Sequence, residues 1–239
     1  MINKVKTAIL LSAGLGSRMR PITNSIPKPL VKVNNKALIE TVIDSLIYYG
    51  VENIYIVTGY LADKFSFLEK KYEEKCKINF VYNKDYETKN NISSLYVAKD
   101  FIKDDCFICE ADLFIPDEKL FSTLSIKNSS YFGNFVKGHS DDWAFVCNSD
   151  KKITKISIGG DNLFNMVGIS VWSKEDFQKI ANRVEKMMNE PNGDSKFWDE
   201  AVDDILDRIS VHVLPVEKGQ IIEIDTVEEL ERVRKNYEQ

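Results

Sequence analysis

The 239-residue chain has no long hydrophobic run and no excess of positive charge. Its longest apolar runs have the length of strands, far short of the roughly 20 residues that a membrane-spanning helix needs. The net charge is −5, whereas a nucleic-acid-binding domain is expected to carry a basic face. Met1-Ile2-Asn3-Lys4 leads directly into an apolar strand, which leaves no room for a signal peptide. We therefore expect a cytoplasmic protein that binds neither membranes nor nucleic acid.

Histidine and cysteine are also scarce, with two and four residues. Neither His139 nor His212 has a serine or cysteine motif around it, so a nucleophilic triad has no support. Cys106 and Cys109 have Cys-x-x-Cys spacing within a strand-like run. Residues three apart on a strand face opposite sides, so this pair cannot chelate one ion and is expected as buried free thiols.

The first half of the chain alternates between strand-like and helix-like stretches. Apolar or β-branched runs predict strands, and apolar residues at helical spacing predict helices. In order, these stretches lie at 5–11, 36–49, 53–58, 61–72, 78–82, 91–101 and 106–111. The alternation predicts an α/β fold with a doubly wound, mainly parallel sheet and right-handed crossovers. Ligands of such sheets bind beyond the carboxyl ends of the strands.

The second half changes to shorter strands joined by short loops. Strands at 130–136, 144–147 and 153–158 predict a small antiparallel extension, and a strand at 166–172 is expected back in the main sheet. The other predicted helices and late strands lie at 116–124, 174–189, 197–208, 211–215, 221–224 and 226–235. The length and the 44% hydrophobic content predict a single domain with an ample core over residues 1–239.

A glycine-rich turn, Ser12-Ala13-Gly14-Leu15-Gly16-Ser17-Arg18, follows the first predicted strand, and Pro27-Lys28-Pro29 comes after it. Successive backbone N–H groups in such a turn form a concave anion site, and Arg18 and Lys28 add positive charge. The turn lacks the Lys-Ser/Thr pair of a Walker A loop, and Met19 stands where the dinucleotide fingerprint needs a third glycine. The pattern predicts a cradle for a triphosphate.

The run from Leu10 to Leu30 resembles the signature of nucleotidyltransferases of the sugar-nucleotide pyrophosphorylase type, and the chain is most similar to the small bacterial CTP:phosphocholine cytidylyltransferases. The resemblance covers nearly the whole chain. It also rests on Val57-Thr58-Gly59-Tyr60, Tyr82-Asn83-Lys84-Asp85-Tyr86, Asn90-Asn91-Ile92-Ser93-Ser94-Leu95, Glu110-Ala111-Asp112, Phe197-Trp198-Asp199 and Glu223-Ile224-Asp225. It implies a Rossmann-like nucleotidyltransferase fold that transfers CMP from CTP to phosphocholine, giving CDP-choline and pyrophosphate. Residues 1–112 are then the nucleotide-binding half and residues 113–239 the acceptor-binding half.

Two aspartates stand at the ligand edge of the predicted sheet. Asp112 and Asp225 each follow a strand, and each alone reads as a turn or capping residue. Beside a phosphate loop they favour Mg²⁺, which prefers one or two carboxylates together with phosphate oxygens and waters. In the family that the chain resembles, the matching aspartates hold the metal against the α-phosphate. Glu110 and Glu223 lie one step deeper on the same strand faces and are expected only to touch the ligands of the metal, not the metal itself.

The nucleotide needs hydrogen-bonding groups beside the charges. Either Asn90 or Asn91 could instead cap the helix that follows. The resemblance favours cytosine, whereas the residues alone leave uracil and thymine open. Arg18 is expected to neutralise the leaving pyrophosphate, and Lys28 to hold the α-phosphate or the attacking phosphate. The expected nucleotide-binding residues are Leu11, Ala13, Gly14, Gly16, Ser17, Gly59, Tyr60, Asn83, Asn90 and Ser94.

The acceptor half contains two pairs of a tryptophan and an acid. Trp143, preceded by two aspartates, and Trp198 with Asp199 are expected to hold a trimethylammonium through ring faces and negative charge. Core packing of each tryptophan is the alternative. Phosphoethanolamine, 2-aminoethylphosphonate and a sugar 1-phosphate stay open as acceptors, since a primary amine would need more direct carboxylate contacts.

A non-catalytic, nucleotide-sensing module is the alternative from another class of protein. Such a module would be expected to lose the lysine or a metal-binding aspartate, and Lys28, Asp112 and Asp225 are all present. The expected partners are small-molecule substrates, and the sequence leaves monomer and homodimer open.

Overall fold

The computed structural model describes residues 2 and 4–237. Met1 and Asn3, on which the expectation about a signal peptide partly rests, lie outside the described residues. Within the described chain, no helix combines the length and the apolar character needed to cross a membrane. The α-helices are α1 (Leu38–Tyr49), α2 (Phe67–Tyr72), α3 (Ile92–Ala98), α4 (Leu120–Thr123), α5 (Lys174–Met188), α6 (Trp198–Asp203) and α7 (Val227–Tyr237).

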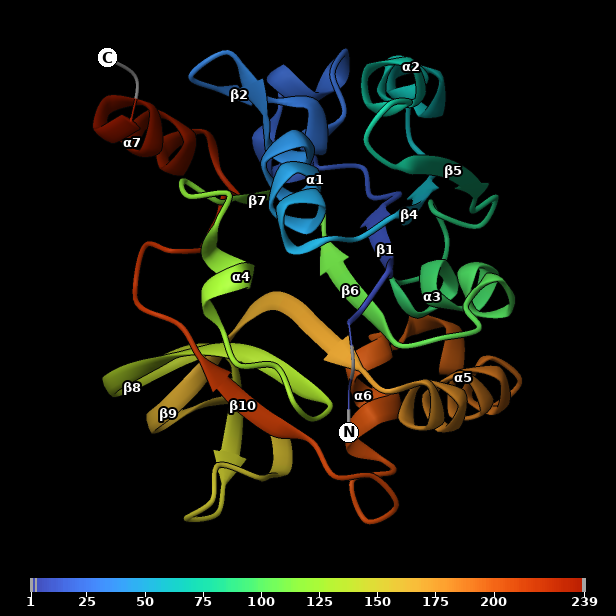
Figure 1. The fold of residues 1–239 in the computed structure, drawn as a ribbon, viewed down its shortest axis with the longest axis vertical. Coiled ribbons are helices and arrows are strands. Elements are labelled where there is room, and N and C mark those ends of the chain that lie inside the picture. Colours follow the sequence, from blue (N-terminus) through green and yellow to red (C-terminus); the bar gives the residue numbers. More distant parts are fainter. Residues whose placement is uncertain (1, 3, 238–239) are drawn as a thin grey trace.

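A seven-stranded sheet with the order β10-β8-β9-β6-β1-β4-β5 forms the centre of the structure (Figure 1). The strands β6, β1, β4 and β5 are parallel, β9 runs antiparallel to β6, and β8 runs antiparallel to β9. These strands are β1 (Thr7–Ser12), β4 (Asn53–Thr58), β5 (Lys77–Tyr82), β6 (Cys106–Glu110), β8 (Ser130–Cys147), β9 (Ile153–Trp172) and β10 (His212–Pro215). The predicted doubly wound, mainly parallel sheet is confirmed.

Two small antiparallel pairs lie outside this sheet. They are β2 (Lys32–Val33) with β3 (Lys36–Ala37), and β7 (Leu113–Phe114) with β11 (Ile222–Glu223). The second pair has a consequence for function, because it brings the late strand of the chain beside the turn that follows β6.

Both faces of the parallel strands are covered. One hydrophobic cluster packs α1, α2 and α4 on one face, and a second packs α3, α5 and α6 on the other. A strand buried on both faces reads as a continuous apolar run, which is why β1 and β6 were evident in the sequence. Cys109 belongs to the first cluster and Cys106 to the second, and both are buried free thiols. The expectation that they face opposite sides of the strand is confirmed.

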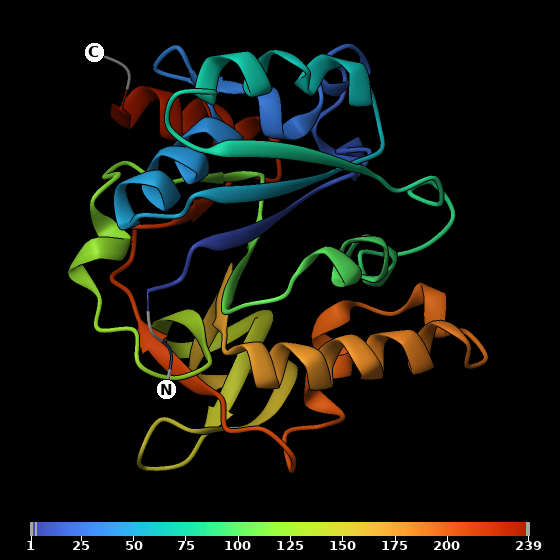
Figure 2. The same cartoon turned by 45° about the vertical axis from the view of Figure 1, so that its right-hand side comes forward.

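The antiparallel extension differs in detail from its prediction. The expected strands at 130–136 and 144–147 are parts of one long strand, β8, and those at 153–158 and 166–172 are parts of β9. Bulges interrupt their register, one of them between Val136 and His139, where Gly138 has a φ of +86°. Such bulges bend a strand without ending it, so the two strands curl away from the parallel part of the sheet (Figure 2).

Several predicted helices are shorter in the structure. The helix expected at 197–208 is only Trp198–Asp203, the one at 116–124 is Leu120–Thr123, and the one at 61–72 divides into a 3₁₀ turn, Ala62–Phe65, and α2. In each case the apolar spacing that predicts the longer helix extends into neighbouring turns. Some side chains in these turns are buried at similar spacing, but the backbone does not form regular helical hydrogen bonds.

Candidate active site

A cleft of about 330 Å³ lies beyond the carboxyl ends of the parallel strands. Of the residues predicted to bind the nucleotide, the structure brings eight to its lining, together with Arg18, Lys28, Asp112 and Asp225. The eight are Leu11, Ala13, Gly14, Gly16, Ser17, Asn83, Asn90 and Ser94. Gly59 and Tyr60 are not among the lining residues. They contact the glycine loop instead, since the Tyr60 N–H donates to the Ala13 carbonyl at 3.1 Å.

The glycine loop needs a residue without a side chain at Gly16. This residue has a φ of +60°, and a Cβ placed there would lie 2.9 Å from the Cβ of Lys28. The Thr23 hydroxyl donates to the Gly16 carbonyl at 2.8 Å, which fixes the turn. Gly16 therefore lets the loop approach the backbone that carries Lys28.

Lys28 is the centre of the charged part of the cleft. Its ammonium donates to Asp112 Oδ2 and to Asp225 Oδ1, each at 2.5 Å, although only 9% of the side chain is exposed. Burial opposes the charged form, but the two aspartates outweigh it and hold the pKa of Lys28 above its ordinary value. Arg18, which is mostly exposed, donates to the same Asp225 oxygen at 2.7 Å. Burial likewise works to raise the pKa of Asp225, but the contacts with Lys28 and Arg18 hold it below its usual range.

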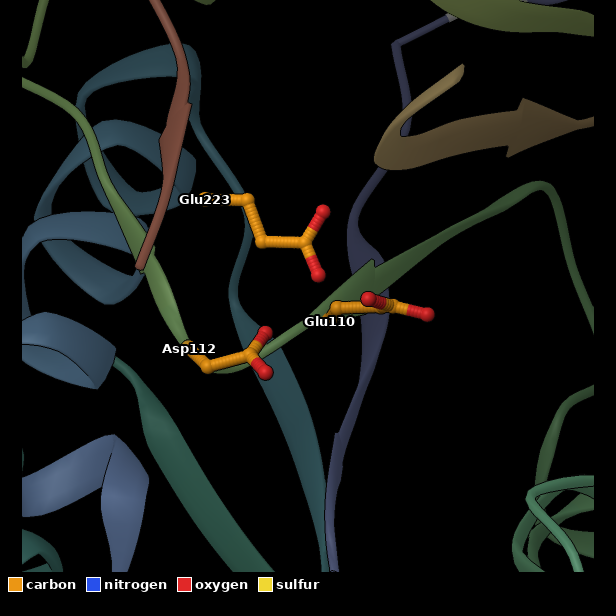
Figure 3. A group of neighbouring side chains, drawn as sticks. All are labelled: Glu110, Asp112 and Glu223. Atoms are coloured by element: carbon orange, nitrogen blue, oxygen red, sulfur yellow. The ribbon is translucent and has the colours of Figure 1, made fainter. Parts of the chain in front are cut away.

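Three carboxylates gather beside this ion pair. One oxygen each of Glu110, Asp112 and Glu223 lies within 4.8 Å of the others, and Figure 3 shows the three side chains gathered in one place. Glu223 reaches it because β11 pairs with β7, the strand that starts just after Asp112. The sequence predicts that the two glutamates touch the ligands of a metal and not the metal itself, but in the structure one oxygen of each lies within 4.8 Å of an Asp112 oxygen.

The donor set fits a hard divalent cation. Asp112 Oδ1 is buried and has no hydrogen-bond partner in the described chain, although a carboxylate oxygen normally accepts one. Burial, and then the charges of Asp112 and Glu223, raise the pKa of Glu110 well above its usual range. Carboxylate oxygens are among the ligands that Mg²⁺ prefers.

Polar side chains at the start of α3 complete the cleft. The buried Asn83 amide donates to the hydroxyls of Ser93 and Ser94 at 2.9 and 3.1 Å, which fixes the first turn of the helix. Neither Asn90 nor Asn91 caps α3 with its side chain. The Asn90 oxygen accepts the N–H of Asn91 instead. Asn91 thus holds the N-cap position of α3 without a side-chain capping hydrogen bond.

Sequence reasoning missed Ser12 as a lining residue. Its hydroxyl is buried, lines the cleft and has no partner in the described part of the chain. Its place between an apolar strand and a glycine loop was the available signal. Tyr86 and Lys89 also line the cleft.

A small side cavity adjoins the cleft, and the two share Leu11 and Glu110. Tyr131, Trp198 and Asp199 lie along its wall. Asp199 is buried and accepts a hydrogen bond of 2.8 Å from the Tyr131 hydroxyl. Burial raises the pKa of Asp199 to about 7, although that hydrogen bond favours the ionised form.

The two predicted acceptor-binding tryptophans have different surroundings. Trp198 is buried and stacks on Tyr131 with ring centroids 5.8 Å apart. Trp143 packs edge-on against Phe197 at 5.4 Å and is not among the residues that line the side cavity. The structure thus brings Trp198 and Asp199 to this cavity and leaves Trp143 outside it.

The glycine loop, the paired aspartates and the buried lysine lie together at the carboxyl edge of a doubly wound sheet, where such sheets bind their ligands. The model of the nucleotidyl transferase family matches residues 7–137. The chain is 42% identical over 230 residues to the 2-aminoethylphosphonate cytidylyltransferase of Lancefieldella rimae, which covers 95% of this chain and 92% of that relative. It is 32% identical over 232 residues to the choline-phosphate cytidylyltransferase of Streptococcus pneumoniae, with coverages of 96% and 98%.

Solved structures agree with these relatives. The CTP:phosphocholine cytidylyltransferase from Streptococcus pneumoniae matches with a TM-score of 0.87 at 30% identity, over 97% of this chain and 99% of that one. The inositol-1-phosphate CTP transferase of T. maritima shares the fold, with a TM-score of 0.75 at 19% identity over 100% of this chain and 98% of that one. The chain belongs to the nucleotidyl transferase family, and these full-length sequence relatives are cytidylyltransferases.

The buried carboxyl of Asp199 predicts a pH-dependent stability. The folded state binds the proton of the Asp199 carboxyl more tightly than the unfolded state does. The stability that this proton contributes is complete below about pH 4 and is lost as the pH rises through about 7. Asp199→Asn removes this titration. The stability of the variant relative to the parent should therefore rise by up to ~4 kcal/mol between pH 4 and pH 8.

Urea unfolding at a series of pH values measures this difference. Tyr131→Phe is the companion variant, because losing the hydroxyl disfavours the ionised carboxylate and should extend the loss of stability to higher pH. If the parent and Asp199→Asn have parallel pH profiles, the carboxyl does not titrate in this range.

Proposed function

We propose that the protein transfers CMP from CTP to a small acceptor that has a phosphonate or phosphate at one end and a primary ammonium at the other, with 2-aminoethylphosphonate as the first candidate. Pyrophosphate is the second product. The observation that carries the proposal is the side cavity, which places the buried carboxylate of Asp199 next to the charged end of the cleft. An acceptor with its phosphorus group in the cleft can place its ammonium there.

The size and charge of the side cavity support a primary ammonium. The cavity, with a volume of about 10 Å³, has room for about one water-sized group. An –NH₃⁺ group is close to that size, and a trimethylammonium is much larger. Asp199 and Glu110 both have raised pKa values, so a bound cation would favour their ionised forms. The relative with 42% identity supports the same acceptor.

Phosphocholine is the second candidate. The rings of Trp198 and Tyr131 line the side cavity, and aromatic faces attract quaternary ammonium groups. Choline-phosphate cytidylyltransferases at 32% and 29% identity also favour it. A cage made by Trp143 and Trp198 would need both rings at one cavity, and only Trp198 lies there.

In the proposed mechanism an anionic oxygen of the acceptor attacks the α-phosphorus of CTP in line, the bond to the β-phosphate oxygen breaks, and pyrophosphate leaves. The attacking oxygen already carries charge, so no general base is required. Backbone N–H groups of Gly14, Gly16 and Ser17 hold the phosphates, and Arg18 neutralises the leaving group. Lys28 is released from the aspartates toward the reacting phosphate.

Magnesium is the proposed cofactor. Asp112 and Asp225 would hold it, with Glu110 and Glu223 close enough to join them. When bound, the ion supplies charge neutralisation at the phosphate oxygens. We propose a cytoplasmic enzyme that acts on small molecules as a monomer or homodimer.

Lys28→Ala is expected to lower kcat by about a hundredfold or more, the scale for losing one preorganised charge at a reacting oxyanion. Pyrophosphate release with CTP, Mg²⁺ and 2-aminoethylphosphonate measures it. Lys36→Ala is the matched control, because Lys36 forms an ion pair with Asp44 outside the cleft. Near-parent activity in folded Lys28→Ala would remove this lysine from the mechanism.

Asp112→Asn and Asp225→Asn should each raise the Mg²⁺ concentration for half-maximal activity by about tenfold or more, because an amide is a poorer ligand for a hard cation. Mg²⁺ titrations of the initial rate measure this. Asp117→Asn changes an exposed carboxylate and should keep the parent's curve. Two variants with the parent's Mg²⁺ dependence would place the metal elsewhere.

The parent should prefer 2-aminoethylphosphonate to phosphocholine by about tenfold or more in kcat/KM. Asp199→Asn should reduce that ratio and leave the KM for CTP within about twofold, because its carboxylate is placed to bind only the ammonium. Trp143→Ala should change neither acceptor by more than about twofold. If the parent prefers phosphocholine, the second candidate is the acceptor. A strong loss of kcat/KM for phosphocholine in Trp143→Ala would support a cage that includes Trp143.

A further inference from the structure

Two adjacent asparagines connect the nucleotide cleft to the helix that carries Asp199. Asn90 and Asn91 precede α3 and line the cleft. The Asn90 backbone N–H donates to the Asp194 carbonyl at 2.8 Å, and its side-chain amide donates to the Ser195 carbonyl at 3.1 Å. The N–H of Trp198 donates to Asn91 Oδ1 at 3.0 Å. The two halves of the chain thus meet through polar contacts at this point.

Helix α6 depends on such contacts. It has six residues, and an isolated helix of that length is unstable in water. A helix also leaves its first N–H groups without intrahelical partners. Glu200 accepts the N–H of Phe197 at 2.8 Å from within the segment, whereas the partner of the Trp198 N–H is Asn91, more than 100 positions earlier in the chain.

The Asn91 contact lies between the two candidate substrate sites. Trp198 and Asp199, the first residues of α6, line the side cavity, and Asn91 itself lines the cleft. Figure 2 shows α3 above the layer formed by α5 and α6, and the side chains of the three helices share one hydrophobic cluster. A nucleotide that fixes Asn91 also fixes the oxygen that accepts the Trp198 N–H.

We infer that Asn91 is a positioning residue that couples binding of the nucleotide to ordering of the acceptor cavity. This inference rests on the proposed function. Filling the cleft holds the start of α3, α3 holds the start of α6, and α6 sets Asp199 in place for the acceptor. Because such coupling is reciprocal, bound acceptor tightens nucleotide binding by the same factor. For one hydrogen bond that factor is about five to ten.

Three variants separate this role from simple support of the fold. Asn91→Leu keeps a side chain that branches at Cγ and removes the accepting oxygen. Asn91→Asp keeps an oxygen that can accept the Trp198 N–H and serves as the rescue. Asn189→Ala is the matched control, because Asn189 also makes a side-chain hydrogen bond at the end of a helix. Its amide donates to the Glu185 carbonyl at 2.8 Å, at the exposed end of α5.

The first measurement needs no acceptor. Hydrogen exchange of the amides of 198–203 is followed with and without CTP and Mg²⁺, with CTP binding checked by calorimetry. In the parent and in Asn189→Ala, CTP should slow this exchange by about tenfold. In Asn91→Leu, at CTP concentrations that calorimetry shows to be saturating, bound CTP should leave the exchange unchanged. Without nucleotide, Asn91→Asp should protect the Trp198 amide as the parent does.

The second measurement is steady-state kinetics at saturating CTP with 2-aminoethylphosphonate and with phosphocholine. Asn91→Leu should raise the acceptor KM by about five- to tenfold and keep kcat within about threefold, and Asn91→Asp should restore the KM. A purely structural role would instead lower kcat and the stability together.

Bound CTP that leaves the exchange of α6 unchanged in the parent, or slows it equally in Asn91→Leu, would overturn the coupling. A parent that shows the coupling but uses neither acceptor supports the inference and overturns the proposed acceptor. A parent that does not bind CTP overturns the proposed nucleotide and this inference with it.

Discussion

The ammonium of Lys28, held between Asp112 and Asp225, is the interaction on which the charged part of the cleft depends. It joins the segment after the glycine loop, the turn after β6 and the segment before α7, which are far apart in the sequence. Glu110 and Glu223 lie beside these aspartates, and like charges this close repel one another. A fixed positive charge among them offsets this repulsion.

The same lysine constrains the backbone around it. Gly16 is required because the loop passes against the Cβ of Lys28, and the lysine itself stands between two prolines whose φ angles are fixed. A separate hydrophobic cluster packs α7 against the segments on either side of Lys28, with Met19, Val31 and Leu230 among its buried members. Apolar burial thus brings the chain end that carries Asp225 to the glycine loop.

The second half of the chain extends the site by a different route. The side cavity shares Glu110 with the cleft, so one carboxyl group lies next to both spaces. Asp199 reaches the cavity from a short helix that meets the first half at Asn90 and Asn91. The side cavity is therefore formed by contacts between segments that no local pattern connects.

Local patterns in the sequence determined the alternation of strands and helices, the glycine loop, the strand-end positions of Asp112 and Asp225, and the opposite faces of Cys106 and Cys109. Each depends on residues close together in the chain, where side-chain period and backbone freedom act directly. Tertiary structure alone decided which side chains share a space. Glu223 joins Glu110 because β11 pairs with β7, and this register depends on packing across more than 100 residues.

The tryptophans and Asn91 show the same division. Trp143 and Trp198 have similar acidic neighbours in the sequence, yet only Trp198 reaches the side cavity, because the bent β8 and β9 place Trp143 against Phe197 instead. Asn91 reads as a helix cap, since its position before α3 is a local signal, whereas its partner on α6 is brought to it only by the packing of α3 against α6. Residue type and spacing determined the kind of chemistry, and long-range packing determined which groups carry it.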